Sequence, residues 1–318
     1  MKKIVFLGTP TFAVKVLAAL VSGDYQIVAV VTQPDKAVGR KKRLTASPVK
    51  NFAQKNDLPV LQPRKLSGSI EESQIIAAKP DLIITAAFGQ FLSNELLASA
   101  KIAAINFHAS LLPKYRGAAP IQGALRDGAN FSGITIMEMV AKMDAGDIFF
   151  QEKIAIDPED NLESLTEKLS NLAQKMAVKD LPLLIKGEFK RQIQDPKLVT
   201  FAPSIKPEDE QLNFQQDSNQ IINQIRSLSP NPGAYFLHQE ERIKIFKAEI
   251  MNTKIDGIPG SIYLKNKKQL GIIAGDHKGI LISQLQIQGG KPLLIQDFLN
   301  GVGRSLKIGD QFVTTTTA

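Results

Sequence analysis

The sequence predicts an α/β protein: an open, mostly parallel sheet with helices on both faces, followed by a smaller domain of short β-strands. Short apolar runs alternate with helical periodicity through the first half of the chain. A proline-containing stretch with few apolar repeats then precedes a region of β-rich segments separated by glycines. We therefore expect an N-terminal domain over residues 1–189, a linker over 190–207 and a C-terminal domain over 208–318.

Strands and helices alternate along the N-terminal domain. Apolar or β-branched runs predict strands at 3–7, 27–31, 81–86, 103–107, 134–140 and 148–156. The Ser47-Pro48 pair, a cap residue before proline, predicts the start of a helix. Helical spacing predicts three more helices, at 12–20, 118–126 and 162–185. This order implies a mostly parallel sheet, which binds ligands at the carboxyl ends of its strands.

The C-terminal domain is predicted to begin with a helix and to continue as a small β-barrel. The helix is expected at 218–228. Strands are expected at 234–238, 242–249, 261–265, 271–274 and 280–286, with glycines between them. An OB-like barrel of this size is compatible with RNA binding.

Bulk composition excludes several classes of protein. The chain is 43% hydrophobic and 22% charged, as in soluble globular proteins, and no apolar run approaches the roughly 18 residues of a membrane span. It contains no cysteine, so disulfides and thiol chemistry are excluded, and a cytoplasmic location fits. With three histidines and no metal-ligand spacing, we expect no metal.

The net charge of +8 is concentrated in one stretch. Between Lys36 and Lys65 there are nine basic residues and one acidic residue, so this stretch alone carries the whole excess. Its centre is the run Arg40, Lys41, Lys42 and Arg43, which follows a glycine. Such a run is either a solvated loop or a loop that contacts phosphates, and its position inside a domain favours phosphates.

Asn106 and His108 form the strongest chemical signal. They end a buried strand, and strand alternation places both side chains on the same side of the chain. Histidine exchanges protons near neutral pH, and the asparagine amide can donate to a carbonyl oxygen that gains charge. Acyl transfer to an amine needs both groups, although a histidine after a strand is also a common structural residue. Ser110 lacks a Gly-x-Ser-x-Gly elbow, which argues against a serine hydrolase.

Two further segments also follow or join predicted strands. Asp144 lies in a Met-Asp-Ala-Gly-Asp turn, where its carboxylate either shapes the turn or reaches His108 and fixes its tautomer. Residues 87–92 are either a plain loop or a slot for a flat heterocycle. Gly8-Thr9-Pro10 lacks the dinucleotide glycine pattern and the Walker lysine, so a dinucleotide or nucleoside triphosphate site is not expected.

Together these segments resemble the methionyl-tRNA formyltransferase family of folate-dependent formyltransferases. The resemblance rests on Phe6-Leu7-Gly8-Thr9-Pro10-Thr11-Phe12, on Thr32-Gln33-Pro34-Asp35, on the segment 110–122 and on Met143-Asp144-Ala145-Gly146-Asp147. It is dense to about residue 150 and weaker beyond residue 200. It implies a Rossmann-like catalytic domain with the formyltransferase fold, joined to an OB-like C-terminal tRNA-binding domain.

The resemblance also implies a reaction. The free α-amine of initiator methionyl-tRNA attacks the formyl carbon of 10-formyltetrahydrofolate, giving N-formylmethionyl-tRNA for translation initiation, without a covalent enzyme intermediate. Asn106, His108 and Asp144 match the family's catalytic residues. Asn106 and protonated His108 would stabilise the oxyanion, while Asp144 would hold His108 and help move a proton. The enzyme is expected to be a cytoplasmic monomer that needs no membrane.

Binding residues are carried over in the same way. The folate segment matches Ser110, Leu111, Leu112 and Pro113, and the pterin pocket is expected along Phe88, Gly89, Gln90 and Leu92. The tRNA-binding loop matches Arg40, Lys41, Lys42 and Arg43. Lys41 stands where the family often has glycine, which adds charge and removes flexibility.

Three alternatives remain open from the residues. The first is a formyltransferase for a small amine, such as a sugar nucleotide or glycinamide ribonucleotide, or a folate hydrolase, neither of which needs the basic loop. The second is a noncatalytic RNA-binding protein with an OB-like module, whose binding would survive replacement of His108. The third is a nucleotide-linked oxidoreductase, against which the missing glycine pattern argues.

Overall fold

The computed structural model describes residues 1–39, 43–238 and 241–312, which fall into two compact units. The first unit comprises residues 1–120, 131–155 and 166–203, and the second comprises 121–130, 156–165 and 204–318. Among the described residues, no helix combines the length and the apolar character needed to cross a membrane. The expected domain boundaries at residues 189 and 207 stay a prediction.

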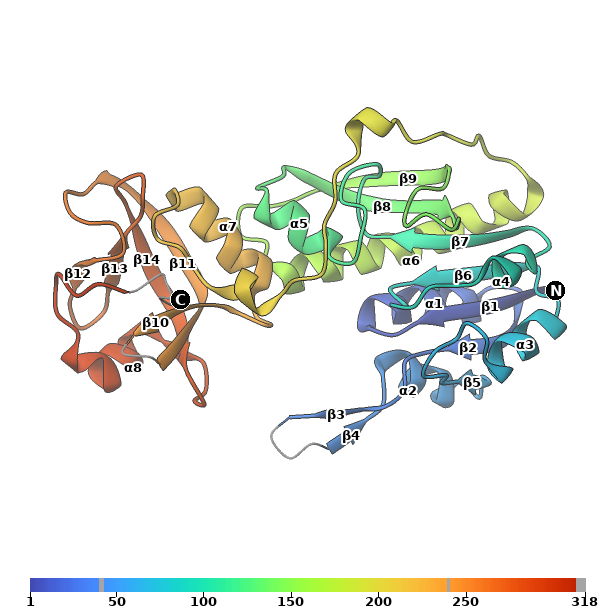
Figure 1. The fold of residues 1–318 in the computed structure, drawn as a ribbon, viewed down its shortest axis with the longest axis horizontal. Helices are drawn as coiled ribbons and strands as arrows, with labels where there is room; N and C mark the ends of the chain where they lie inside the picture. The colour runs from blue at the N-terminus through green and yellow to red at the C-terminus, as the bar shows by residue number, and fades with distance from the viewer. Residues whose placement is uncertain (40–42, 239–240, 313–318) are drawn as a thin grey trace. The chain divides into compact units, whose positions relative to one another are not determined.

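The first unit is built on a seven-stranded sheet (Figure 1). Its strand order is β5-β2-β1-β6-β7-β8-β9. The five parallel strands are β1 (Lys2–Gly8), β2 (Tyr25–Val31), β5 (Val60–Leu61), β6 (Leu82–Ala86) and β7 (Ala103–His108). Two antiparallel strands follow, β8 (Phe131–Glu138) and β9 (Ile148–Ala155). The predicted mostly parallel open sheet is confirmed.

Both faces of this sheet are buried. Val5, Leu7 and Ile83 pack in one cluster with Ile75 and Leu96, which come from two helices. Ile4 and Phe6, which alternate with Val5 and Leu7 along β1, point to the other face and are also fully buried. Burial of both faces explains why these strands read as continuous apolar runs.

Six α-helices lie between residues 11 and 186 of the described chain. They are α1 (Thr11–Ser22), α2 (Pro48–Lys55), α3 (Ile70–Ala77), α4 (Asn94–Ala98), α5 (Pro120–Arg126) and α6 (Leu162–Lys186). Three of them begin at a serine whose hydroxyl accepts a hydrogen bond from the backbone three residues on: Ser47, Ser69 and Ser93. These bonds satisfy amide groups that helix starts leave unpaired. The start predicted at Ser47-Pro48 is confirmed, whereas α3 and α4 were not predicted.

The basic loop is flanked by two short strands that the sequence did not predict. β3 (Lys36–Val38) pairs antiparallel with β4 (Arg43–Thr45), so the segment is a hairpin rather than a plain loop. Gly39, just after β3, has a φ of 74°, a conformation that glycine adopts without strain. Arg43 is exposed on β4, and Arg40, Lys41 and Lys42 lie outside the described residues.

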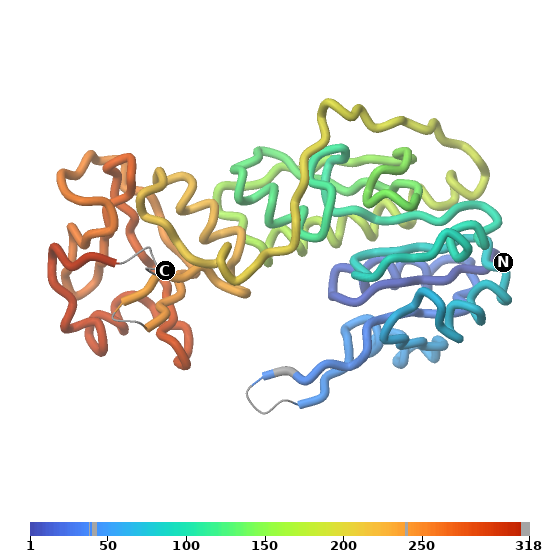
Figure 2. Tube along the Cα trace, viewed as in Figure 1, coloured from blue at the N-terminus to red at the C-terminus, as the bar shows by residue number. Residues whose placement is uncertain are grey.

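The second unit contains one antiparallel sheet with the order β10-β11-β14-β13-β12, and β15 beside β14. Figure 2 traces this part of the chain in orange and red. Its strands are β10 (Ala234–His238), β11 (Glu241–Lys254), β12 (Ile262–Lys265), β13 (Leu270–Ile273), β14 (Lys278–Ile287) and β15 (Leu293–Leu294). The α-helices of this unit beyond residue 204 are α7 (Ser218–Leu228) and α8 (Ile295–Asn300). The predicted helix and the five predicted strands are present, although β11 extends to Lys254.

Aromatic rings fill the core of the second unit. The rings of Phe214 and Phe236 lie 6.0 Å apart, and those of Phe236 and Phe312 lie 4.3 Å apart. α7 is held at its start by Asp217, which accepts from the backbone of Gln220, while the Gln220 side chain accepts from the backbone of Asp217. This capping pair fixes the start of α7.

Residues 191–202, within the predicted linker, pair with the first unit. We call this segment the strap. Gln192 exchanges two backbone hydrogen bonds with Ile148, of 2.8 and 2.9 Å. Near its other end, the carbonyl of Thr200 accepts from the backbone N–H of Arg116, and the N–H of Ala202 donates to the carbonyl of Arg116. The low apolar content of the strap hid this pairing, because backbone hydrogen bonds need no particular side chain.

Candidate active site

Asn106 and His108 lie at the carboxyl end of β7, as expected. Asn106 pairs with Thr85 of β6 and with Met137 of β8, and His108 pairs with Thr135. The two side chains share one face of the strand, about 7 Å apart along the chain at the usual rise of a strand. Asp144 lies in the turn between β8 and β9. These three residues therefore come from a strand end and a neighbouring loop of the same unit.

The structure brings His108 and Asp144 together. The Nδ1 atom of His108 lies 3.7 Å from Oδ1 of Asp144, within ion-pair range but beyond a direct hydrogen bond. The Nε2 atom lies 2.9 Å from the carbonyl oxygen of Tyr115. The two side chains are only 5% and 13% exposed. Both ring nitrogens thus face oxygen atoms, Nε2 within hydrogen-bond distance and Nδ1 beyond it.

Asp144 is held in place by its own backbone and by Gly117. Its φ of 51° lies in the left-handed region, which non-glycine residues rarely adopt outside turns. The Oδ2 atom accepts a 2.8 Å hydrogen bond from the backbone N–H of Gly117. The carboxylate therefore links the β8–β9 turn to the loop after β7, while Oδ1 remains turned toward His108.

Asn106 is oriented by Thr85, a residue that the sequence analysis missed. The Thr85 hydroxyl lies 2.8 Å from Oδ1 of Asn106 and farther, 3.2 Å, from the carbonyl of Ile105 and the sulfur of Met139. Donation to the nearest acceptor keeps the amide oxygen turned toward β6. Within the ranges that the structure describes, the amide nitrogen of Asn106 makes no hydrogen bond, so its N–H donors remain available to a ligand.

Replacing Thr85 with valine is expected to lower kcat for formyl transfer about three- to tenfold, the scale of one net hydrogen bond. Valine keeps the shape but leaves the Asn106 amide free to turn over. Steady-state kinetics measure the effect, and Thr253→Val, at an exposed position, serves as the matched control. Unchanged kcat in Thr85→Val would exclude this orienting role.

Gly146 lets the Asp144 turn approach β8 closely. It is buried, and a Cβ added there would collide with the carbonyl oxygen of Glu138 and lie 2.8 Å from its carbonyl carbon. Gly146→Ala is therefore expected to destabilise the protein by about 1–3 kcal/mol, the usual cost of overpacking, and to lower activity with it. Urea unfolding tests this, with exposed Gly290→Ala as control; equal midpoints for the two variants would contradict it.

The predicted folate segment is a tightly bonded loop. The Ser110 hydroxyl donates to the carbonyl of Lys114 at 2.6 Å, so it is committed to the loop. Thr135 donates to the carbonyl of Ser110 and accepts from the backbone of Leu112. Leu112 packs with Met137 and Ile148, and the peptide bond that joins it to Pro113 is cis. Leu111 and Pro113 are half-buried, so the loop presents a mixed apolar and backbone surface.

The predicted pterin segment contributes mainly backbone. Phe88 is 4% exposed and packs in the core together with Leu92, while its carbonyl accepts from Thr9 and Gln33. Gln90 bonds at both ends of its amide to residues 63–66. Gly89 is exposed with a φ of 82°. The ring of Phe88 thus stabilises the fold, and Gly89 exposes backbone without a side chain.

The base of the basic hairpin is anchored by Asp35. Its carboxylate accepts from Lys50 at 2.7 and 2.9 Å and from Gln62 at 2.8 Å. These hydrogen bonds, from Gln62 first and then from Lys50, lower the pKa of Asp35. The hairpin therefore starts from a point that several hydrogen bonds hold, and Arg43 on β4 is exposed.

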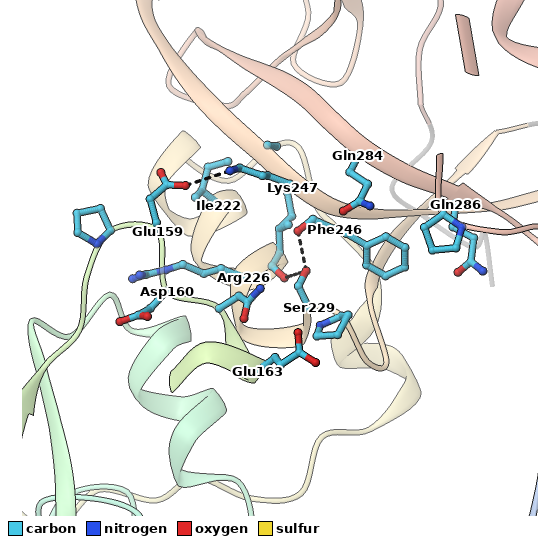
Figure 3. A pocket seen from close by; sticks show the side chains of 16 residues that line it. Glu159, Asp160, Glu163, Ile222, Arg226, Ser229, Phe246, Lys247, Gln284 and Gln286 are labelled. Carbon is cyan, nitrogen blue, oxygen red and sulfur yellow. Dashed lines mark hydrogen bonds and ion pairs between the residues drawn. The ribbon is translucent and has the colours of Figure 1, made fainter. Parts of the chain in front are cut away.

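A separate cavity of about 430 Å³ lies wholly within the second unit (Figure 3). Charges of both signs line it, including Glu159 and Lys247, whose side chains form a 3.2 Å ion pair. Burial lowers the pKa of Arg226 in its wall, and nearby Asp160 acts in the opposite direction. Its lining carries three carboxylates and two cations, and none of the residues predicted to bind a ligand lies in it.

Known protein families and relatives match nearly the whole chain. Residues 2–181 match the family described as Formyl transferase, and residues 204–303 match the Formyl transferase C-terminal domain. The chain is 50% identical over 313 residues to the methionyl-tRNA formyltransferase of Latilactobacillus sakei, which covers 98% of both proteins. It is 46% identical over 314 residues to that of Streptococcus gordonii, covering 98% of this chain and 99% of that protein.

Solved structures share the fold. A sugar 3N-formyl transferase, WlaRD, solved in the presence of dTDP and 5-N-formyl-THF, aligns with a TM-score of 0.68 at 20% identity, covering 92% of this chain and 99% of that one. The methionyl-tRNA formyltransferase of Clostridium thermocellum aligns with a TM-score of 0.53 at 18% identity, covering 80% and 96%. Given the two matched domains and relatives that are half identical over nearly their whole length, this chain belongs to the methionyl-tRNA formyltransferase family.

Proposed function

We propose that this formyltransferase moves the formyl group of 10-formyltetrahydrofolate to the α-amine of initiator methionyl-tRNA, with Asn106, His108 and Asp144 as the catalytic residues. One observation carries the proposal. At the carboxyl end of β7, the free amide donors of Asn106 share a strand face with His108, whose ring lies 3.7 Å from Asp144. Curated relatives that are 50% and 47% identical over 98% of this chain are named methionyl-tRNA formyltransferases.

The reaction transfers one carbon between two nitrogens. The neutral amine attacks the formyl carbon, a C–N bond forms, and the formyl oxygen gains negative charge before the bond to the folate nitrogen breaks. Donors aimed at that oxygen stabilise the transition state more than the ground state. The amide of Asn106 and an N–H of His108 are such donors. The amine already is a competent nucleophile, so no covalent enzyme intermediate is needed.

Asp144 serves as the proton acceptor near the attacking amine. The attacking nitrogen must lose a proton, and the leaving folate nitrogen must gain one, so the protons balance over the reaction. Because the gap of 3.7 Å between Nδ1 of His108 and Oδ1 of Asp144 exceeds a hydrogen bond, Nδ1–H stays available to the substrate oxygen.

The folate is proposed to bind along residues 110–113 and 88–92. These loops follow β7 and β6, two neighbouring parallel strands, at the same edge of the sheet. Ligands bind at this edge in open parallel sheets. The half-buried side chains of Leu111 and Pro113 supply apolar surface, and the exposed backbone at Gly89 supplies hydrogen-bonding groups.

The basic hairpin is proposed to contact the acceptor end of the tRNA. Replacing Arg40, Lys41, Lys42 and Arg43 with glutamine is expected to lower kcat/KM for methionyl-tRNA at least about tenfold at physiological salt, since four phosphate contacts would be lost. The measurement is transfer of labelled formyl to methionyl-tRNA and, in parallel, to small amines.

A matched control carries the same change of charge on exposed lysines of the first unit, namely Lys2, Lys175, Lys186 and Lys190. We expect this control to keep near-normal activity, because the effect depends on position rather than on net charge. Unchanged methionyl-tRNA formylation after neutralising residues 40–43, or faster transfer to a sugar nucleotide than to methionyl-tRNA, would contradict the proposed substrate.

A further inference from the structure

The strap of residues 191–202 contacts both the Asp144 turn and the loop that follows β7, the strand that ends at His108. Near its start it pairs with Ile148, just after the Asp144 turn, and Arg191 forms ion pairs with Glu138 at 2.8 Å and Asp147 at 3.9 Å. Near its end, the Thr200 hydroxyl accepts from the backbone of Tyr115, the residue whose carbonyl contacts His108. The strap therefore touches the surroundings of both His108 and Asp144.

Gln194, in the middle of the strap, joins the two loops through its side chain. It is 6% exposed. Its Nε2 atom donates to the carbonyl of Asp144 at 2.8 Å and to that of Gly146 at 2.7 Å. Its Oε1 atom accepts from Nε and Nη2 of Arg116 at 3.1 and 2.8 Å. A glutamine amide offers two donors and one acceptor with two lone pairs, and all of them are used here.

Arg116 removes any ambiguity about which way the Gln194 amide points. A guanidinium has only donors, so the atom that faces it must be the amide oxygen, and the nitrogen must then face the two carbonyls. Arg116 is itself only 6% exposed, and no carboxylate of the described residues lies within ion-pair distance of it. The neutral Gln194 oxygen is thus the side-chain acceptor that holds this buried cation.

The bonds of Gln194 act on the backbone of the catalytic aspartate. Asp144 adopts a φ of 51°, a conformation that costs free energy and persists only where the surroundings hold it. Gln194 fixes the carbonyls of Asp144 and Gly146, while Gly117, the residue after Arg116, donates to the Asp144 carboxylate. Hydrogen bonds of Gln194 and Gly117 thus join the loop after β7 to the Asp144 turn.

We propose that Gln194 is a positioning residue for formyl transfer, which sets the Asp144 carboxylate relative to the His108 ring. The inference rests on the proposed roles of those two residues. Gln194 does not face the substrate, so its effect passes through Asp144. Misplacement of a catalytic group by about 1 Å costs up to about a hundredfold in rate, so the loss of these bonds should appear in kcat rather than in substrate binding.

The test replaces Gln194 with methionine, which keeps the length of the side chain and removes its hydrogen bonds. We expect kcat to fall about ten- to hundredfold, with KM for methionyl-tRNA and for 10-formyltetrahydrofolate within about threefold of the parent. The pH dependence of kcat is expected to move, because the carboxylate beside His108 is displaced. Gln194→Glu should also lower kcat, because its carboxylate can accept from Arg116 but cannot donate to the carbonyls of Asp144 and Gly146.

Two controls separate positioning from folding. Gln192→Met makes the same change two residues away, where the side chain is exposed and only the backbone is bonded, and should keep parental kinetics. In an Asp144→Asn background, Gln194→Met should lower kcat little further, because its effect acts through the lost carboxylate. Circular dichroism confirms that each variant is folded before its kinetics are compared.

Three results would overturn the inference: parental kcat and pH profile in Gln194→Met, a loss of activity that equals the loss of folded protein, or full additivity with Asp144→Asn. Other results would contradict the proposed function itself. These are a parent enzyme that does not formylate methionyl-tRNA, or full activity of His108→Ala, and neither depends on the Gln194 variants.

Discussion

Replacing His108 with alanine is expected to lower kcat for formylation of methionyl-tRNA by about two to four powers of ten, the usual scale for a lost oxyanion donor or acid–base group. The ring is 5% exposed and held by the Tyr115 carbonyl on one side, beside Asp144 on the other. Alanine removes the donor without disturbing the backbone of β7. Single-turnover transfer of labelled formyl measures the chemical step directly.

The chain contains a suitable control for this change. His277 lies in the second unit with a φ of 60°, a conformation that asparagine tolerates, so His277→Asn should leave formylation near the parental rate. His108→Ala that retains close to parental turnover would remove His108 from the mechanism, and with it the proposed role of its contact with Asp144.

Asp144→Asn is expected to lower kcat by a similar two to four powers of ten. The substitution keeps the size of the side chain and can keep the acceptor for Gly117, yet it places a neutral amide where a carboxylate faces Nδ1 of His108. The negative charge that faces the His108 ring and accepts the proton of the amine is lost. Initial rates across a range of pH measure the loss.

The matched control is Asp147→Asn, three residues along the same turn. Asp147 is 31% exposed and lies 3.9 Å from Arg191, an exposed ion pair of small energetic value. Its replacement should change kcat by no more than a few-fold. An Asp144→Asn enzyme that works as well as Asp147→Asn would show that proton transfer does not pass through Asp144.

Elements with a strong local signal were predicted well. β10 and α7 begin and end at the predicted residues, and α6 ends one residue beyond its predicted end. Continuous apolar runs identified β1, β2, β6 and β7, because both faces of this sheet are buried. The shortest elements were missed: β5 and β15 have two residues each, too few for any periodicity to be visible.

The sequence predicts the proposed catalytic residues better than it predicts the residues that position them. Asn106, His108 and Asp144 belong to recognisable motifs after predicted strands, so the sequence alone identified them as candidates. Thr85 belongs to no recognisable motif, and Gln194 lies in a proline-containing stretch that the sequence predicts only as a linker. Both matter because of the atoms they meet, Oδ1 of Asn106 and the carbonyls of the Asp144 turn.

By itself, the sequence determined the alternation of strands and helices, the position of the basic run, and the three side chains proposed to be catalytic: two hydrogen-bond donors and one carboxylate. These features depend on residue type and on spacing of a few residues, which local physics governs. Only the tertiary structure decided that the His108 ring meets Asp144, 36 residues away, and that Gln194 holds that turn from 50 residues away. Contacts at such separations depend on how strands pair and loops pack, and no local preference of the chain specifies them.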